Sequence, residues 1–199
     1  MIERDIRSAM PFRFDAATHQ YIALDTGEIL PHITSLLQQS GWVDERWFTE
    51  ESCARGTAVH KLTADVDYGV LTDCDTIDTR YRSYILSHIK AMRMIPHQFL
   101  AIEEPAVHPT LRFGGTPDRE LIAWGLRSVL ELKTGSYAKS HPVQLALQAI
   151  LLSAEARLPP ETFGRFCLYL KPNGRSPVFQ EFTDRRDFDE AYRIIKEYA

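Results

Sequence analysis

The first thirty residues contain hydrophobic and polar side chains in an alternation typical of short strands. Residues 12–14 and 21–24 show this pattern, and Asp25-Thr26-Gly27 is a sequence typical of turns. The turn leads into a third short segment, residues 28–30. This part of the chain therefore predicts a small β-hairpin.

Hydrophobic residues recur at helical spacing between residues 34 and 92. Thr34 is a suitable N-cap for a short helix that stops at Gly41. A longer helix is expected to begin at Asp44, with an interruption near Gly56, and a third helix is expected after Asp75. The second helix is predicted to bury Val59, Leu62 and Val66, and the third Tyr81, Ile85, Ile89 and Met92.

Short β-rich runs separated by proline and glycine dominate the chain from residue 99 onward. Three consecutive strands are predicted, over residues 99–107, 113–124 and 128–134. Ser140 is a suitable N-cap for a helix over residues 141–156. Two further strands (163–170 and 178–182) precede a final helix that is expected to bury Phe188, Tyr192 and Ile195. This order indicates an α/β or α+β domain with a partly antiparallel sheet.

The composition is that of an ordinary globular domain. The chain has 199 residues, of which 44% are hydrophobic and 25% charged, so collagen, a disordered tail and a coiled coil are excluded. We expect a single domain over residues 1–199. No apolar run approaches the length of a membrane span, and the first ten residues are too charged for a signal peptide. The expected location is the cytoplasm, without a membrane partner.

Charge and cysteine content restrict the chemistry further. Three widely spaced cysteines argue against a disulfide framework and against a cysteine-based zinc or iron–sulfur site. The formal net charge is −4, yet residues 112–175 hold nine basic against five acidic residues. This local excess permits a phosphate contact, although an ordinary solvated surface explains it about equally well.

Candidate catalytic groups lie in two of the predicted strands. Strand alternation places Glu131 and Lys133 on one face, opposite Leu130 and Leu132. Asp118 stands 13 residues before Glu131, so two adjacent strands can bring the carboxylates together. A close carboxylate pair is commonly stabilised by Mg²⁺, and a neighbouring lysine can orient a water molecule.

These residues resemble the signature of the PD-(D/E)xK nuclease superfamily. Pro117-Asp118 matches its PD pair, and Glu131-Leu132-Lys133 matches its (D/E)xK triplet. Further segments are similar to the RecB-like and lambda-exonuclease-like branch. Gly56–His60 resembles the G-x-x-x-H helix of that branch, and Gln144–Gln148 resembles its Q-x-x-x-Y helix. Glu103, followed by Glu104-Pro105, resembles its upstream acidic strand. Gln148 departs from the tyrosine usual in that branch. Residues 19–21 and 30–34 are similar to the opening of phage-type members, so the resemblance spans roughly residues 19 to 171.

The resemblance implies a restriction-endonuclease-like core: a central mixed β-sheet flanked by helices, preceded by an N-terminal β-hairpin and helices. Residues 1–43 would form the hairpin and short helix, and residues 99–170 the catalytic core. The implied cofactor is Mg²⁺ or Mn²⁺, without an iron–sulfur cluster, since such members use four cysteines. The implied metal ligands are Asp118, Glu131, the backbone carbonyl of Leu132, His60 and Glu103.

The implied catalytic residues are Asp118, Glu131, Lys133 and Gln144. DNA contacts are expected from Gln144 and Gln148, and from Lys139 and Ser140, because amides at a helix start can bind phosphate. Each auxiliary residue also has a structural interpretation: His60 as a helix histidine, and Gln144 as part of an amphipathic surface. Glu103 and Glu104 can both belong to a solvated strand edge, and which of them faces the metal is left open, with Glu103 favoured.

The function implied is a metal-dependent DNA exonuclease that acts from DNA ends in phage or bacterial recombination or repair. A structure-specific endonuclease and a catalytically silent nucleic-acid-binding module of the same fold are the alternatives. The expected partners are DNA with free ends and a single-strand annealing or binding protein. A homo-oligomer is left open.

Overall fold

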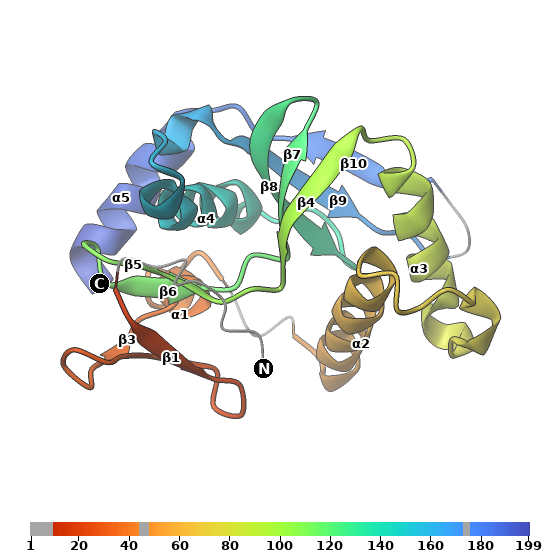
Figure 1. Ribbon diagram of the computed structural model, residues 1–199, viewed down its shortest axis with the longest axis horizontal. Helices are drawn as coiled ribbons and strands as arrows, with labels where there is room; N and C mark the ends of the chain where they lie inside the picture. Colours follow the sequence, from red (N-terminus) through yellow and green to blue (C-terminus); the bar gives the residue numbers. More distant parts are fainter. Residues whose placement is uncertain (1–9, 44–47, 173–175) are drawn as a thin grey trace.

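The computed structural model describes residues 10–43, 48–172 and 176–199. The helix start expected at Asp44 and most of the charged N-terminal segment lie outside these residues. Figure 1 shows a central sheet with helices on both faces, and a smaller N-terminal sheet below it. Within the described residues there are five α-helices, none of which is long and apolar enough to cross a membrane.

The central sheet is mixed and has the strand order β10-β9-β8-β7-β4. Strands β8 and β9 are parallel and the other neighbours antiparallel. The only parallel pair needs a crossover, which helix α4 (Ser140–Ala156) provides. The bounds are β4 His97–Ile102, β7 Arg119–Ala123, β8 Leu126–Lys133, β9 Gly164–Tyr169 and β10 Val178–Glu181. The expected α/β fold with a mixed sheet is confirmed.

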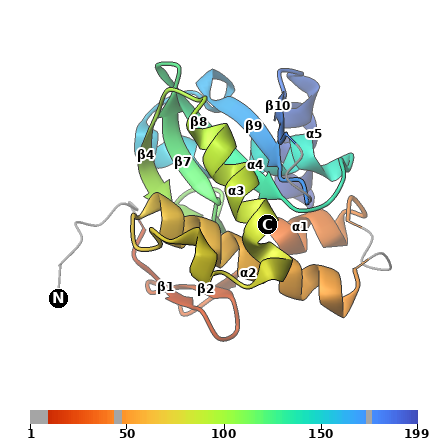
Figure 2. The same cartoon turned by 90° about the vertical axis from the view of Figure 1, so that its right-hand side faces the viewer.

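Two hydrophobic cores lie on opposite faces of this sheet. Helices α4 and α5 (Arg186–Tyr198) cover one face, where Val129 and Cys167 point. Helices α2 (Glu50–Asp67) and α3 (Thr79–Met92) cover the other, where Leu130 and Leu132 point (Figure 2). Strand alternation in β8 therefore decides which side chains face which helix layer.

The N-terminal segment forms a three-stranded antiparallel sheet, which confirms and extends the predicted hairpin. Its strands are β1 Phe12–Asp15, β2 Gln20–Ala23 and β3 Ile29–Leu30, followed by α1 Ile33–Gln39. Tyr21 is fully buried, and its hydroxyl lies 2.6 Å from Thr116 Oγ1. Gly114 allows this approach, because a Cβ there would lie 2.5 Å from the Tyr21 ring.

Two of the predicted long strands are each broken into two. The segment 99–107 divides into β4 and β5 (Ala106–His108), since Glu103 has a positive φ of 50° and Pro105 follows it. The segment 113–124 divides into β6 (Phe113–Gly115) and β7, because Pro117 lacks a backbone donor for the ladder. Strands β5 and β6 pair with each other as a separate ribbon.

Several helix predictions are wrong in detail. His32, not Thr34, is the N-cap of α1, and Lys139 precedes α4, so that Ser140 is its first helical residue. Helix α2 runs through Gly56 without interruption, because a capping box at Thr49 and burial of its apolar face outweigh the roughly 1 kcal/mol cost of a helical glycine.

The third helix begins with Asp78 as its cap, after the 3₁₀ turn η2 (Cys74–Thr76). A second 3₁₀ turn, η3 (Pro160–Thr162), precedes β9. Tyr192 of α5 is exposed rather than buried. The face of α5 that packs on the core is Phe188, Ala191, Ile194 and Ile195.

Candidate metal centre

Asp118 lies where the chain enters β7, directly before the first ladder pair of β7 with β8. Its carboxylate is buried, with 5% of the residue exposed. Oδ2 accepts a hydrogen bond from the Leu132 amide at 2.7 Å. Because β7 begins only at Arg119, the Asp118 side chain takes the place of a β7 backbone acceptor for the Leu132 amide of β8. This hydrogen bond fixes the carboxylate next to the backbone of Leu132.

His60 and Glu103 complete a cluster with Asp118. His60 Nδ1 lies 3.1 Å from Asp118 Oδ1 and 3.6 Å from Glu103 Oε1. His60 Nε2 lies 3.1 Å from the Leu132 carbonyl oxygen, and the Glu103 amide donates to the Asp118 carbonyl oxygen at 3.0 Å. The structure therefore brings four of the five expected ligand groups together, and it is Glu103, rather than Glu104, that joins them.

One potential ligand atom from each of His60, Glu103 and Asp118 lies within 4.8 Å of the others. Two carboxylates are the hard oxygen donors that Mg²⁺ and Mn²⁺ prefer, and an imidazole is better suited to Mn²⁺. Both His60 and Glu103 remain partly exposed, so the cluster is open on one side. These residues therefore fit a divalent cation with space for water or substrate oxygens.

Glu131 faces the other side of the sheet and is not a member of this cluster. Its Oε1 accepts from Lys133 Nζ at 2.8 Å and from Gln144 Nε2 at 2.6 Å, and its Oε2 accepts from Gln148 Nε2 at 2.7 Å. Lys133 Nζ also donates to Gln144 Oε1 at 3.1 Å. The expected catalytic residues Glu131, Lys133 and Gln144 thus form one hydrogen-bonded group, with Gln148 behind them.

The two groups differ in their electrostatics. Burial alone lowers the pKa of His60, but the charges and hydrogen bonds of Asp118 and Glu103 outweigh it, so that the pKa lies well above its usual value. Burial and the Asp118 charge raise the pKa of Glu131, despite the nearby lysine. Burial opposes the charged form of Lys133, yet Glu131 and Asp118 raise its pKa overall.

A small cavity of about 50 Å³ lies beside Gln144 and Gln148, where helix α4 approaches the N-terminal sheet. Gln148 is 2% exposed, and its Oε1 has no hydrogen-bond partner. Among the residues that line this cavity are His19 and His32, whose ring centroids are 5.3 Å apart. Gln148 therefore reaches both Glu131 and this cavity.

The other expected DNA contacts lie at the start of α4. Lys139 is exposed there, while Ser140 is buried, with 8% of its surface exposed. Neither side chain hydrogen-bonds to the Glu131 group in the described part of the chain. Lys139 is the better placed of the two for a solvent-side contact.

Sequence reasoning missed a buried network behind the cluster. Arg119 is fully buried and donates to Glu103 Oε1 at 3.2 Å, the Asp118 carbonyl oxygen at 2.6 Å and Asp67 Oδ2 at 2.7 Å. Asp67 also contacts His88 Nε2 at 2.8 Å, and Arg119 donates to Thr63 Oγ1 at 3.1 Å. His60, Thr63 and Asp67 follow helical spacing, which is the sequence signal that points to this network.

Comparison with known proteins does not identify a family. No family model matches the chain, and a search of curated proteins found no match. The interpretation of the site therefore rests on its residues and their geometry.

Proposed function

We propose that this protein is a Mg²⁺- or Mn²⁺-dependent nuclease with a restriction-endonuclease-like fold, related to the PD-(D/E)xK superfamily. The observation that carries the proposal is the convergence of Asp118, Glu103 and His60 on the backbone of Leu132, between Glu131 and Lys133 in sequence. Three segments that are distant in the chain meet there, which supports a common role for their side chains in holding a cation.

The cation would be held by Asp118, Glu103, His60 and the Leu132 carbonyl, while Glu131 stays outside this ligand set, hydrogen-bonded to Lys133, Gln144 and Gln148. When bound, it supplies a Lewis acid for the phosphate and lowers the pKa of a coordinated water molecule. It would also relieve the repulsion that raises the pKa of Glu131 next to Asp118.

Lys133 is placed to act on the attacking water and on the phosphate. Its ammonium is fixed by Glu131 and Gln144 and stays charged, because both carboxylates raise its pKa. A fixed positive charge stabilises the negative charge that develops on the phosphate during in-line attack. Gln144 holds both Glu131 and Lys133, so it orients this pair and lies next to the expected scissile phosphate.

We propose DNA as the substrate and cleavage from an end, in recombination or repair and together with a single-strand annealing or binding protein. Cleavage from an end is proposed from the sequence resemblance to the lambda-exonuclease-like branch. The endonuclease and the silent binding module remain the competing functions.

Digestion of linear and covalently closed circular DNA in the presence of Mg²⁺ separates these three functions. An exonuclease degrades only the linear molecule, an endonuclease also opens the circle, and a silent module binds without cleaving either. Asp118→Asn protein, purified in the same way, shows whether any digestion comes from a contaminant.

A further inference from the structure

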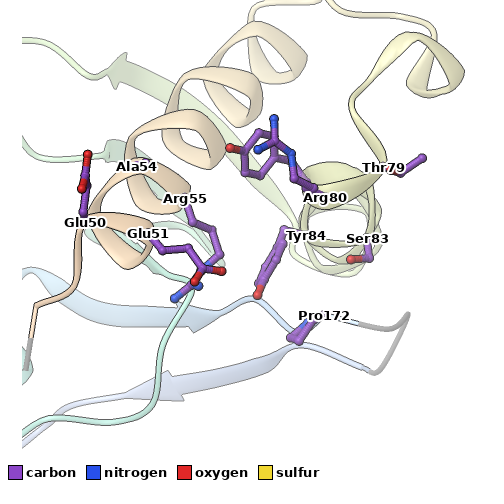
Figure 3. A pocket seen from close by; sticks show the side chains of 10 residues that line it. Glu50, Glu51, Ala54, Arg55, Thr79, Arg80, Ser83, Tyr84 and Pro172 are labelled. Atoms are coloured by element: carbon purple, nitrogen blue, oxygen red, sulfur yellow. The ribbon is translucent and has the colours of Figure 1, made fainter.

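A second hollow, lined by residues with no role in the proposed site, lies between the first turns of α2 and α3. It has a volume of about 770 Å³ and is closed at one end by Pro172, which follows β9. Figure 3 shows Arg55 and Tyr84 extending from two different helices into the same space. We call this hollow the α2–α3 groove; Glu50, Glu51, Ala54, Arg80, Tyr81 and Ser83 contribute to its walls.

Arg55 is the unusual residue of the groove. Its Nε is buried and has no hydrogen-bond partner, and its guanidinium forms no ion pair within the described residues, even with Glu51 four positions earlier. Arg82 also has an unpaired Nε, but its Nη2 donates to the Asp75 and Ile77 carbonyl oxygens. The buried Nε of Arg55 is therefore a donor that an acceptor on a ligand in the groove can satisfy.

The groove also offers an aromatic surface next to this cation. Arg80 lies over the Tyr81 ring, with Cζ 5.2 Å from the centroid, while it pairs with Asp78. A planar guanidinium on a tyrosine is a surface on which a nucleobase can stack. The lining therefore combines a donor for a phosphate oxygen with a stacking surface for a base.

The acidic residues in the wall restrict what can bind. Glu50 and Glu51 balance the charges of Arg55 and Arg80, so the wall has no excess positive charge with which to attract a polyphosphate or a duplex backbone. One phosphodiester with its base carries a single charge and fits the volume better. The lining thus selects a single unpaired nucleotide.

The groove and the metal centre share helix α2 and one edge of the central sheet. Arg55 precedes His60 by five residues, a rise of about 7.5 Å along the helix axis. The Leu170 amide, two residues before Pro172, donates to the carbonyl oxygen of Lys133. A strand that leaves the metal centre along α2 would therefore reach the groove within a few nucleotides.

We propose that the α2–α3 groove binds one unpaired nucleotide of a single-stranded nucleic acid, with Arg55 donating to its phosphate and the Arg80–Tyr81 pair stacking on its base. The direction of the nucleic-acid strand relative to the metal centre rests on the proposed nuclease function. The binding of a nucleotide in the groove does not depend on that function.

The test measures the affinity of a fluorescent oligothymidylate by anisotropy, in full-length Asp118→Asn protein so that cleavage cannot interfere. Arg55→Ala is expected to raise the Kd about tenfold, because a charge-assisted hydrogen bond is lost. Arg186→Ala, an exposed arginine on α5, is the matched control and is expected to leave the Kd unchanged.

Ala54 provides a second test that leaves Arg55 in place, since it is exposed on the groove wall. Ala54→Lys is expected to lower the Kd and Ala54→Glu to raise it, each about threefold at low salt. Equal affinities for Ala54→Lys, Ala54→Glu and the parent protein, or an Arg55→Ala Kd within twofold of the parent, would overturn the proposal. Binding without any cleavage by the wild-type protein would overturn the nuclease function alone.

Discussion

The two sides of strand β8 carry polar groups that are organised in opposite ways. On the α2 side, His60, Glu103 and Asp118 place more negative than positive charge around an open space. On the α4 side, Glu131 receives hydrogen bonds from Lys133, Gln144 and Gln148 and is nearly sealed. The difference teaches that the proposed metal ion would bind on the α2 side, whereas on the α4 side the Lys133 ammonium already balances the charge of Glu131.

The largest effect is expected from removing the carboxylate that faces the α2 side. Asp118→Asn should abolish DNA cleavage, because a ligand charge is lost with almost no change in volume. The fold should survive, since an amide oxygen can still accept from the Leu132 amide. Digestion assays together with thermal unfolding check this, with exposed Asp189→Asn as the control. Wild-type activity in Asp118→Asn protein would falsify the site.

Removal of the Lys133 ammonium, the positive charge on the α4 side, should slow the cleavage step without weakening metal binding. Lys133→Ala should reduce the single-turnover cleavage rate by at least about 10²-fold, the scale of one lost electrostatic stabiliser. Its Mn²⁺ affinity should stay within a few-fold of wild type, as measured by calorimetry. Lys196→Ala on α5 is the control. If metal binding collapses instead, Lys133 has a structural role and the two sides are not separate.

Arg119 tests whether the cluster depends on its buried support. Arg119→Lys keeps the charge, but its single ammonium nitrogen cannot span the acceptors that Nε, Nη1 and Nη2 of Arg119 reach separately, so Mn²⁺ affinity should fall about 10- to 100-fold. The matched control is Arg165→Lys, at a buried arginine that pairs with Asp187 in the first turn of α5. That variant should lose stability and keep its Mn²⁺ affinity. Equal affinity losses in the two variants would contradict a positioning role.

The smallest expected effect is a difference in pH dependence between two histidines. Burial, with a contribution from Lys133, lowers the pKa of His141 to about 4, whereas the unfolded chain titrates near 6.5. The unfolded state therefore binds more protons between these values, and the stability contributed by His141 is lost as the pH falls through this window.

For His60 the sign is reversed, since its pKa is raised in the fold. Its contribution is complete below about pH 6.5 and is lost as the pH rises through the folded-state pKa. Urea unfolding of metal-free protein at several pH values checks both: His141→Asn should flatten the acid side of the stability profile and His60→Asn the alkaline side. The same change of slope in both variants would show that the two environments do not differ.

Local patterns were enough to predict most of the fold. Alternation in Val129–Lys133 correctly separated the two faces of β8, and the spacing of Asp118 and Glu131 correctly placed them on adjacent strands. The breaks after β4 and β6 were missed. The first depends on the left-handed backbone conformation of Glu103, and the second on Pro117, which lies two residues before β7.

The candidate site was predictable in its members but not in its division into two groups. Motif spacing led to His60 and Glu103, whereas the direction of the Glu131 carboxylate is decided by three donors from α4 and β8. Arg119 could not be singled out from the sequence, because its burial results from α2 packing over the sheet, which no local pattern reveals.

The most direct test is to locate a bound ion by anomalous diffraction from crystals of this protein soaked in Mn²⁺. The account predicts a peak within bonding distance of Asp118 and Glu103 oxygens and of a His60 ring nitrogen. A peak on the α4 side that contacts Glu131 and leaves His60 and Glu103 without metal would contradict it.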